Sequence, residues 1–301
     1  IVRDSVIRDN QTRHNSYAYT VRGMGIYIAN GVHQIRNCAI TRNLAAVSIP
    51  RGDAVHVAGG AVEIANCTLY WHRTEGVRRD GGEVTLRNSI IWECGNPVVG
   101  TVTRVASAVQ GLDGAADPQF ERGLFLAAAS PYHDAGDRTV AAAGLDGYTV
   151  RADGAADVGA AALGYHFPPG TAARDWYVDA AGGSDANAGL APGSPFKTIG
   201  RALATVGPGG HIRLAPGLYD TANGEVFPLV LQNHYGVHLL GADPATTVLR
   251  APGADNKRVV SLQFVYPGAR IEGVTICDGW IKAQNATGAG LNVLHAQGMV
   301  A

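Results

Sequence analysis

The chain of 301 residues has no long apolar run, almost no net charge and only four cysteines. A membrane-spanning helix needs roughly 18 or more consecutive apolar residues, and no segment approaches that length. The formal net charge of −1 provides no broad basic surface for nucleic acid. The cysteine spacings match neither a disulfide framework nor a zinc motif. We therefore expect no membrane span, no nucleic-acid partner and no zinc site.

Aromatic residues are also scarce, at 7%, whereas glycine is abundant, with 40 residues. Hydrophobic residues make up 46% of the chain, which is ordinary for a folded globular protein. Because no long helical pattern of apolar residues accompanies the glycines, many short strands joined by tight turns are expected. The composition therefore favours an all-β fold over a helical bundle.

An internal repeat is the clearest positive signal. Five segments share an apolar residue, then Asn, Asp or Gly two positions later, then a small residue and a second apolar residue: 1–10, 34–43, 63–72, 85–94 and 270–279. Aligning Val2, Ile35, Ile64 and Leu86 gives steps of 33, 29 and 22 residues. These are coil lengths of a right-handed parallel β-helix, in which each turn adds one strand to each of several stacked sheets. The column expected to point into the core is Ile7, Ile40, Leu69, Ile91 and Ile276.

Two further columns accompany this repeat. Segments 23–28, 52–57 and 288–293 form a second ladder of strands, each with glycine at its start. Asp4, Asn37, Asn66 and Asn88 occupy one turn position, where we expect side-chain amides to bond from coil to coil. Cys38 and Cys67 share one inward position, which favours core packing and leaves a disulfide between coils as the alternative.

Residues 175–219 read as a short strand, a turn-rich stretch, one helix near 195–206 and a second strand. Ser194 is the expected N-cap of that helix, followed by Pro195. The motifs YVD, GSDANAG, SPFKTIGRAL, GGHIRLAPGLY, FPLVL and GVHLLGAD between Trp176 and Asp243 resemble the opening cap of bacterial secreted β-helix proteins of the pectin-lyase-like superfamily. The resemblance implies a right-handed parallel β-helix solenoid and an extracellular or cell-surface location.

An opening cap past the middle of the chain predicts an unusual organisation. Residues 101–168 lose the repeat and resemble the closing segment that covers the last coil in this superfamily. We therefore expect residues 1–168 to be the back half of a β-helix with its closing cap. Residues 169–174 are the expected linker, and residues 175–301 the opening cap and front half of the next β-helix.

The two ends of the sequence continue one another in register. Counting from Ile271 through residue 301 and on to Val2 gives 32 residues, within the series of coil lengths. One period of a tandem repeat, chains that dock head to tail, and a circular permutation all explain this. Because an open β-helix end leaves strand edges unpaired, we favour an extracellular structural subunit that partners itself in a filament or tandem array. The expected seam residues are Ile1, Val2, Val6, Ile7, Leu291, Val293 and Val300.

The alternative class is a polysaccharide lyase or glycoside hydrolase. Asp278, Asp9, Arg42, Trp71 and Glu93 follow the first strand on successive coils. In pectate-lyase-like enzymes a carboxylate cluster holds Ca²⁺ and an Arg acts as base, so the resemblance implies Asp9, Arg42 and Asp278 as catalytic candidates, with Arg8 as another base and Asp9 and Asp278 as Ca²⁺ ligands. The competing interpretation is a plain ion-pair row. No third or fourth carboxylate falls on a coil next to Asp9 and Asp278, which favours a non-enzymatic protein. The one possible cofactor is Ca²⁺.

Two weaker candidates remain. A column of Asn292, Tyr27, His56 and Arg78 is expected to face outward, where it lines a saccharide groove or forms an ordinary sheet face. Asp185 and Asn187 match part of a calcium loop, but Asx-turn chemistry explains the same pattern. The partners expected are therefore the chain itself and a polysaccharide.

Overall fold

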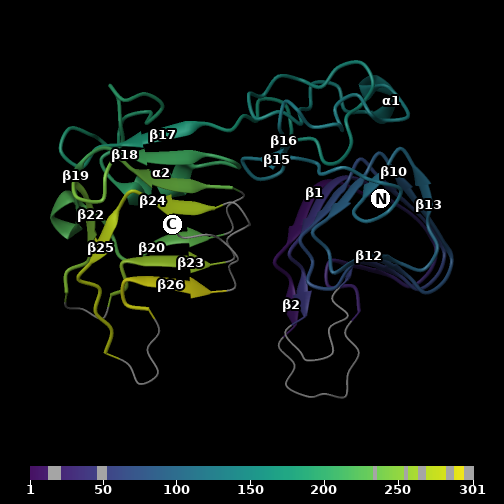
Figure 1. Cartoon of the computed structure of the whole chain (residues 1–301), viewed down its shortest axis with the longest axis horizontal. Coiled ribbons are helices and arrows are strands. Elements are labelled where there is room, and N and C mark those ends of the chain that lie inside the picture. Colours follow the sequence, from purple (N-terminus) through teal and green to yellow (C-terminus); the bar gives the residue numbers. More distant parts are fainter. Residues whose placement is uncertain are drawn as a thin grey trace. The chain divides into compact units, whose positions relative to one another are not determined.

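The structure is a computed structural model that describes residues 1–12, 22–45, 53–232, 236–253, 257–263, 269–282 and 288–294. It divides into two compact units (Figure 1). Unit 1 comprises residues 1–119 and 126–171, and unit 2 comprises residues 120–125 and 172–301. The division after Thr171 falls inside the stretch expected to be the linker.

Unit 1 is built from parallel strands in stacked ladders. One ladder contains β1 (Val2–Arg8), β4 (Val32–Thr41), β7 (Ala61–Ala65), β10 (Glu83–Arg87) and β13 (Thr103–Val105). The long strand β4 also pairs into a second ladder with β8 (Thr68–Tyr70), β11 (Ile90–Trp92) and β14 (Ala108–Val109). A third ladder contains β3 (Ile26–Ile28), β6 (Asp53–Val57), β9 (Glu75–Arg79) and β12 (Asn96–Val99). The short pair is β2 (Gln11–Thr12) with β5 (Leu44–Ala45).

The register predicted from the repeat is confirmed residue by residue. Val2 pairs with Ile35, Ile35 with Ile64, and Ile64 with Leu86. The inward column is also confirmed within unit 1, since Ile40, Leu69 and Ile91 are fully buried in one apolar cluster and Ile7 packs against it. Each coil therefore adds one aliphatic residue to a continuous core, as the alternation of the strands requires.

Non-glycine residues in the left-handed backbone region make the turns between ladders. Asp4, Asn37, Asn66 and Asn88 have φ between 47° and 52°, and we call this column the Asn corner. Asn and Asp adopt this region more readily than other side chains because they bond locally to the backbone. Next to it, the backbone N–H of Cys38 contacts Cys67 Sγ at 3.4 Å, and the N–H of Cys67 donates to Ser89 Oγ at 3.1 Å. Both cysteines are free and buried, so they serve as small core residues.

A lateral segment, residues 126–167, runs across the Asn corner of several coils. The segment begins at the last residue of β16 (Phe125–Leu126), which pairs with β15 (Phe120–Glu121), and it contains the short helix α1 (Val140–Ala143). His166 N–H donates to Asn37 Oδ1 at 2.8 Å, Tyr165 N–H to Thr68 Oγ1 at 2.9 Å, and Gly164 N–H to the Asn88 carbonyl at 2.8 Å. The segment thus bonds along the side of the solenoid, because the corner amides offer partners on several coils.

Unit 2 repeats the parallel arrangement with three ladders (Figure 1). The first contains β17 (Asp175–Val178), β18 (His211–Leu214), β21 (His238–Gly241) and β24 (Arg270–Glu272). The second contains β19 (Gly217–Tyr219), β22 (Thr247–Arg250) and β25 (Thr275–Cys277). The third contains β20 (Leu229–Gln232), β23 (Val260–Gln263) and β26 (Leu291–Leu294), and a 3₁₀ turn spans Thr221–Asn223. These ladders enclose a second apolar cluster.

The helix of the opening cap, α2 (Ile199–Thr205), is shorter than predicted. Its N-cap is Thr198, whose side chain accepts a hydrogen bond from Arg201 N–H, and the prediction of Ser194 as N-cap is wrong. Two further N–H groups at the start of the helix, from Ile199 and Gly200, donate to the carboxylate of Glu225. A carboxylate from a distant loop therefore fixes where the helix begins, which the local sequence does not reveal.

Candidate functional site

Both units have an open coil whose strands are paired on one side only among the described residues. In unit 1 these strands are β1 and β3, and in unit 2 they are β24, β25 and β26. Val6 is 45% exposed, although its register partner Ala39 is buried, and Val293 is 47% exposed, although its partner Leu262 is buried. One more coil on either face would therefore cover positions that are buried on the inner coils.

The other described seam residues divide into an exposed pair and a half-buried pair. Ile1 and Val2 are 82% and 37% exposed, whereas Ile7 and Leu291 are half-buried against their cores. Val300 lies outside the described residues.

The row of catalytic candidates occupies a second left-handed turn. Asp9, Arg42, Trp71, Glu93 and Asp278 have φ between 50° and 60°. The Arg42 side chain is fully buried, with its Nε 3.1 Å from Asp9 Oδ1 and its guanidinium 4.9 Å from the centre of the Trp71 ring. Asp9 also pairs with Arg8 at 3.4 Å. Asp9 and Arg42 are thus brought together in unit 1, but the Arg42 side chain is buried and does not face solvent.

Asp278 lies in unit 2, beside a hollow of about 580 Å³. Asp220, Arg250 and Trp280 also line this hollow. Arg250 pairs with Asp220 at 2.6 Å, and Trp280 is 44% exposed. Burial alone would raise the pKa of Asp220, but the ion pair with Arg250 and backbone N–H donors hold the pKa below its usual value. The hollow thus combines an exposed indole with charged groups.

Three of the four residues predicted to line a saccharide groove are aligned in unit 1, but their side chains differ in exposure to solvent. Tyr27, His56 and Arg78 pair in register, and Tyr27 packs edge-on against the His56 ring at 5.3 Å. Tyr27 is 46% exposed, whereas His56 is buried with its Nε2 3.0 Å from Asp80. Burial lowers the pKa of His56, although Asp80 opposes this. Asn292 is in unit 2, paired in register with Ser261.

The two candidates for a calcium loop use their side chains to hold the turn before α2. Asp185 Oδ1 accepts the N–H groups of Lys197 and Thr198, both at 2.9 Å, and Asn187 Nδ2 donates to the Pro195 carbonyl at 2.7 Å. In the described part of the chain, no group of three or more His, Cys, Asp or Glu side chains is placed to hold a metal ion. Nor is any described helix long and apolar enough to cross a membrane.

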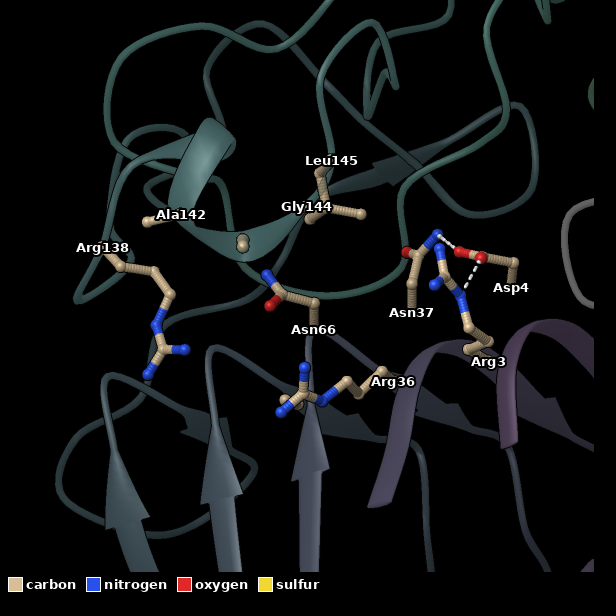
Figure 2. A pocket seen from close by; sticks show the side chains of 11 residues that line it. Arg3, Asp4, Arg36, Asn37, Asn66, Arg138, Ala142, Gly144 and Leu145 are labelled. Atoms are coloured by element: carbon tan, nitrogen blue, oxygen red, sulfur yellow. Dashed lines mark hydrogen bonds and ion pairs between the residues drawn. The ribbon is translucent and has the colours of Figure 1, made fainter. Parts of the chain in front are cut away.

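A cavity of about 130 Å³ lies between the Asn corner and α1, and we call it the corner cavity (Figure 2). Its lining comprises Arg3, Asp4, Arg36, Asn37, Ala65, Asn66, Arg138, Ala142, Ala143, Gly144 and Leu145. Arg3 pairs with Asp4 at 2.7 Å, Arg36 with Glu63 at 3.2 Å, and Arg138 with Asp137 at 3.1 Å. Burial would raise the pKa of Asp4, but hydrogen bonds from Asn37 and Arg3 hold it below the ordinary value.

Sequence reasoning missed this cavity because the lateral segment and the Asn corner are far apart along the chain. The Asn corner itself was predicted, but as a ladder bonded from coil to coil. Asn37 Nδ2 does donate to Asp4 Oδ1 at 3.0 Å, yet it also donates to the His166 carbonyl at 3.0 Å. Asn88 Oδ1 accepts from Asp137 N–H at 3.0 Å. The side chains of Asn37 and Asn88 therefore bond to the backbone of the lateral segment, where bonds from coil to coil were predicted.

Comparisons with known proteins support the architecture of both units. Residues 2–114 match a family described as "Right handed beta helix region", and residues 181–252 match one described as "Protein of unknown function (DUF1565)". No curated protein and no solved structure matches the chain. With its parallel ladders and these two matches, the chain has an all-β, right-handed parallel β-helix fold of the pectin-lyase-like kind.

Proposed function

We propose that this β-helix is an extracellular structural subunit whose two units are completed by neighbouring copies. In the proposed assembly, the open coil of unit 2 (β24, β25 and β26) stacks on the open coil of unit 1 (β1 and β3) of the next copy. The copies are either tandem repeats of one polypeptide or separate chains that dock. The product is a filament or array of β-helices.

The observation that carries the proposal is the contrast in exposure between an open coil and the coil behind it. Val6 and Val293 are 45% and 47% exposed, and their register partners are 1% and 5% exposed. Unpaired edges of parallel strands are templates for a further strand, and the exposed valines add apolar surface to that template. Because the two faces are different surfaces, contact between them is heterologous and propagates unless it closes into a ring.

The location outside the cell rests on the resemblance of residues 176–243 to secreted β-helix proteins. The buried free cysteines of this chain do not argue for a reducing compartment, because Cys38 and Cys67 pack as small core residues.

The experiment places a lysine on each open face. The wild-type chain, Val6→Lys and Val293→Lys are compared by light scattering after gel filtration over a range of concentrations, with electron microscopy of the same fractions. Lysine on a strand edge opposes pairing, so each variant is expected to form no long assemblies. A mixture of the two variants retains one compatible pair of faces and should give dimers only.

The matched controls are Val158→Lys and Val226→Lys, because these valines are 71% and 78% exposed and belong to none of the open strands. Both controls should assemble like the wild type. Monomers of the wild-type chain at every concentration, or unchanged assembly of both edge variants, would contradict the proposal.

Glycan binding is a second candidate, favoured by the hollow beside Trp280. An exposed indole flanked by Asp220 and Arg250 offers a stacking surface and hydrogen-bonding groups. Titration with neutral and acidic oligosaccharides, followed by Trp fluorescence in the wild type and in Trp280→Ala, tests it. A lyase would need a base within reach of a polysaccharide, and the buried Arg42 does not provide one.

A further inference from the structure

The corner cavity lies over Asn66, a member of the Asn corner whose side-chain Nδ2 has no hydrogen-bonding partner among the described residues; Asn88 Nδ2 shares this property but does not line the cavity. Asn37 is bonded to the backbone of His166, and Asn88 Oδ1 to the backbone of Asp137. Asn66 stands between them on the stack, is only 5% exposed, and its Nδ2 has no partner among the described residues. Buried amide donors in folded proteins are almost always paired, so this one calls for an acceptor.

The Asn66 amide faces the space beneath α1 (Figure 2). Helix α1 ends at Gly144, whose φ of 72° allows the chain to turn back directly after Ala143. Ala142, Ala143 and Gly144 carry small or no side chains, so the helix leaves the cavity open instead of filling it. At about 130 Å³ the cavity has room for more than a single water molecule.

Three guanidinium groups surround this space, and each retains spare donors. Arg3, Arg36 and Arg138 each pair with one carboxylate through a single nitrogen. A guanidinium has five N–H donors in a planar fork that matches two oxygens of one carboxylate. Asp4 is the only carboxylate in the lining, and its oxygens already accept from Asn37 and Arg3. The lining therefore offers hydrogen-bond donors, but it has no carboxylate oxygen that is not already bonded.

We propose that the corner cavity binds a small carboxylate, with Asn66 Nδ2 and the guanidinium of Arg36 as donors and Arg138 closing the site from the lateral segment. The carboxylate belongs either to a free short-chain acid or to an acidic sugar. Binding would join the corner of the coils to the lateral segment at the one stacked Asn that the lateral segment does not itself bond. This site is independent of the assembly proposed above.

The test follows the side-chain NH₂ signals of asparagine by NMR during titration with acetate at constant ionic strength. Acetamide, which has the same shape without the charge, is the matched neutral probe. Glucuronate and glucose form a second pair that distinguishes an acidic sugar from a free acid. We expect saturable shifts of the Asn66 signals with acetate, glucuronate or both, and none with acetamide or glucose.

Two variants test the site itself. Asn66→Asp keeps a residue that tolerates the left-handed turn but places a negative charge against the ligand. Affinity, read in this variant from the side-chain NH₂ signals of Asn37 in the same lining, should fall about tenfold or more. Ala142→Leu, at an exposed position of α1, fills the cavity from the outside and should abolish the shifts without touching the coils. Arg104→Gln, at a partly exposed Arg paired with Asp113 outside the cavity, is the control and should bind like the wild type.

The proposal is overturned if acetate and glucuronate shift the Asn66 signals no more than their neutral partners do. It is equally overturned if Ala142→Leu binds the acid with wild-type affinity. Failure of the assembly experiment would leave the result unaffected, because the cavity lies wholly within unit 1.

Discussion

The two units share one coil geometry but differ at the same turn position. In unit 1 the residue two places after the inward Ile35 is Asn37, and its equivalents on the stack are Asn66 and Asn88. In unit 2 the residue two places after Ile271 is Gly273, which has φ of 68° and so occupies the same left-handed region. A Cβ at the neighbouring Gly241 would overlap the carbonyl oxygen of Gly273.

This difference shows what the turn residue decides. Gly273 lets two coils of unit 2 approach each other closely at this position, and no side chain reaches outward from it. Asparagine makes the same turn and adds an amide that binds another segment, which in unit 1 is the lateral segment. The turn residue therefore sets whether this position offers a side-chain hydrogen bond to another segment.

The largest effects should come from the two cores. Leu69→Ala in unit 1 and Leu239→Ala in unit 2 each empty a fully buried position, and each should lower the free energy of unfolding of its own unit by about 2–5 kcal/mol. Trp71 and Trp92 report on unit 1, so urea unfolding followed by fluorescence in a Trp176→Phe/Trp280→Phe background isolates that unit. A loss of unit 1 stability in Leu239→Ala as large as in Leu69→Ala would show that the two units unfold together.

Acid should weaken unit 1 through His72. This ring is buried against the carbonyls of Ile40 and Asn43, and burial lowers its pKa from 6.5 to about 4. Because the unfolded chain takes up the proton first, stability is full above about pH 6.5 and is lost as the pH falls toward about 4, by about 3 kcal/mol. Urea unfolding of His72→Gln against pH should show a weaker dependence than the wild type. His33→Gln, at an exposed His, is the matched control.

The smallest expected effect is the difference in stability cost between two substitutions in the Asn corner. Asn37→Gly leaves a buried N–H of His166 without its acceptor and should cost about 2–3 kcal/mol. Asn66→Gly removes an amide that has no described partner, so its cost should stay within about 1 kcal/mol, the entropy of the added glycine. Thermal unfolding of both variants measures the contrast. Equal costs would mean that both act only through the backbone turn.

Much of the fold could be predicted from the repeat, because register in a parallel stack follows directly from the spacing of inward residues. Val2, Ile35, Ile64 and Leu86 fixed the pairing of four coils, and the structure has that pairing. The start of α2 could not be predicted, because Glu225 caps it from a loop 26 residues after Ile199. The corner cavity could not be predicted either, since Asn66 and Ala142 meet only through the path of the lateral segment.

The row of catalytic candidates shows a different limit of prediction from the sequence. Spacing correctly placed Asp9, Arg42 and Trp71 at one turn position, which their shared φ region bears out. Spacing does not report burial, however, because left-handed turn residues do not follow the alternation of a strand. Arg42 accordingly packs against Trp71 and Asp9 inside the protein.

Residues 120–125 show that the boundary between the units is not a single cut in the sequence. The guanidinium of Arg122 lies 2.7 Å from Asp175 on β17 and 3.0 Å from His211 on β18, within unit 2. Gly236 has no side chain where the backbone of Arg122 and Gly123 passes. A fragment that begins at residue 172 would therefore leave the carboxylate of Asp175 short of one of its two arginines. A fragment of unit 2 therefore has to include residues 120–125, either linked to the chain or added as a separate peptide, to keep the native contacts of its first ladder.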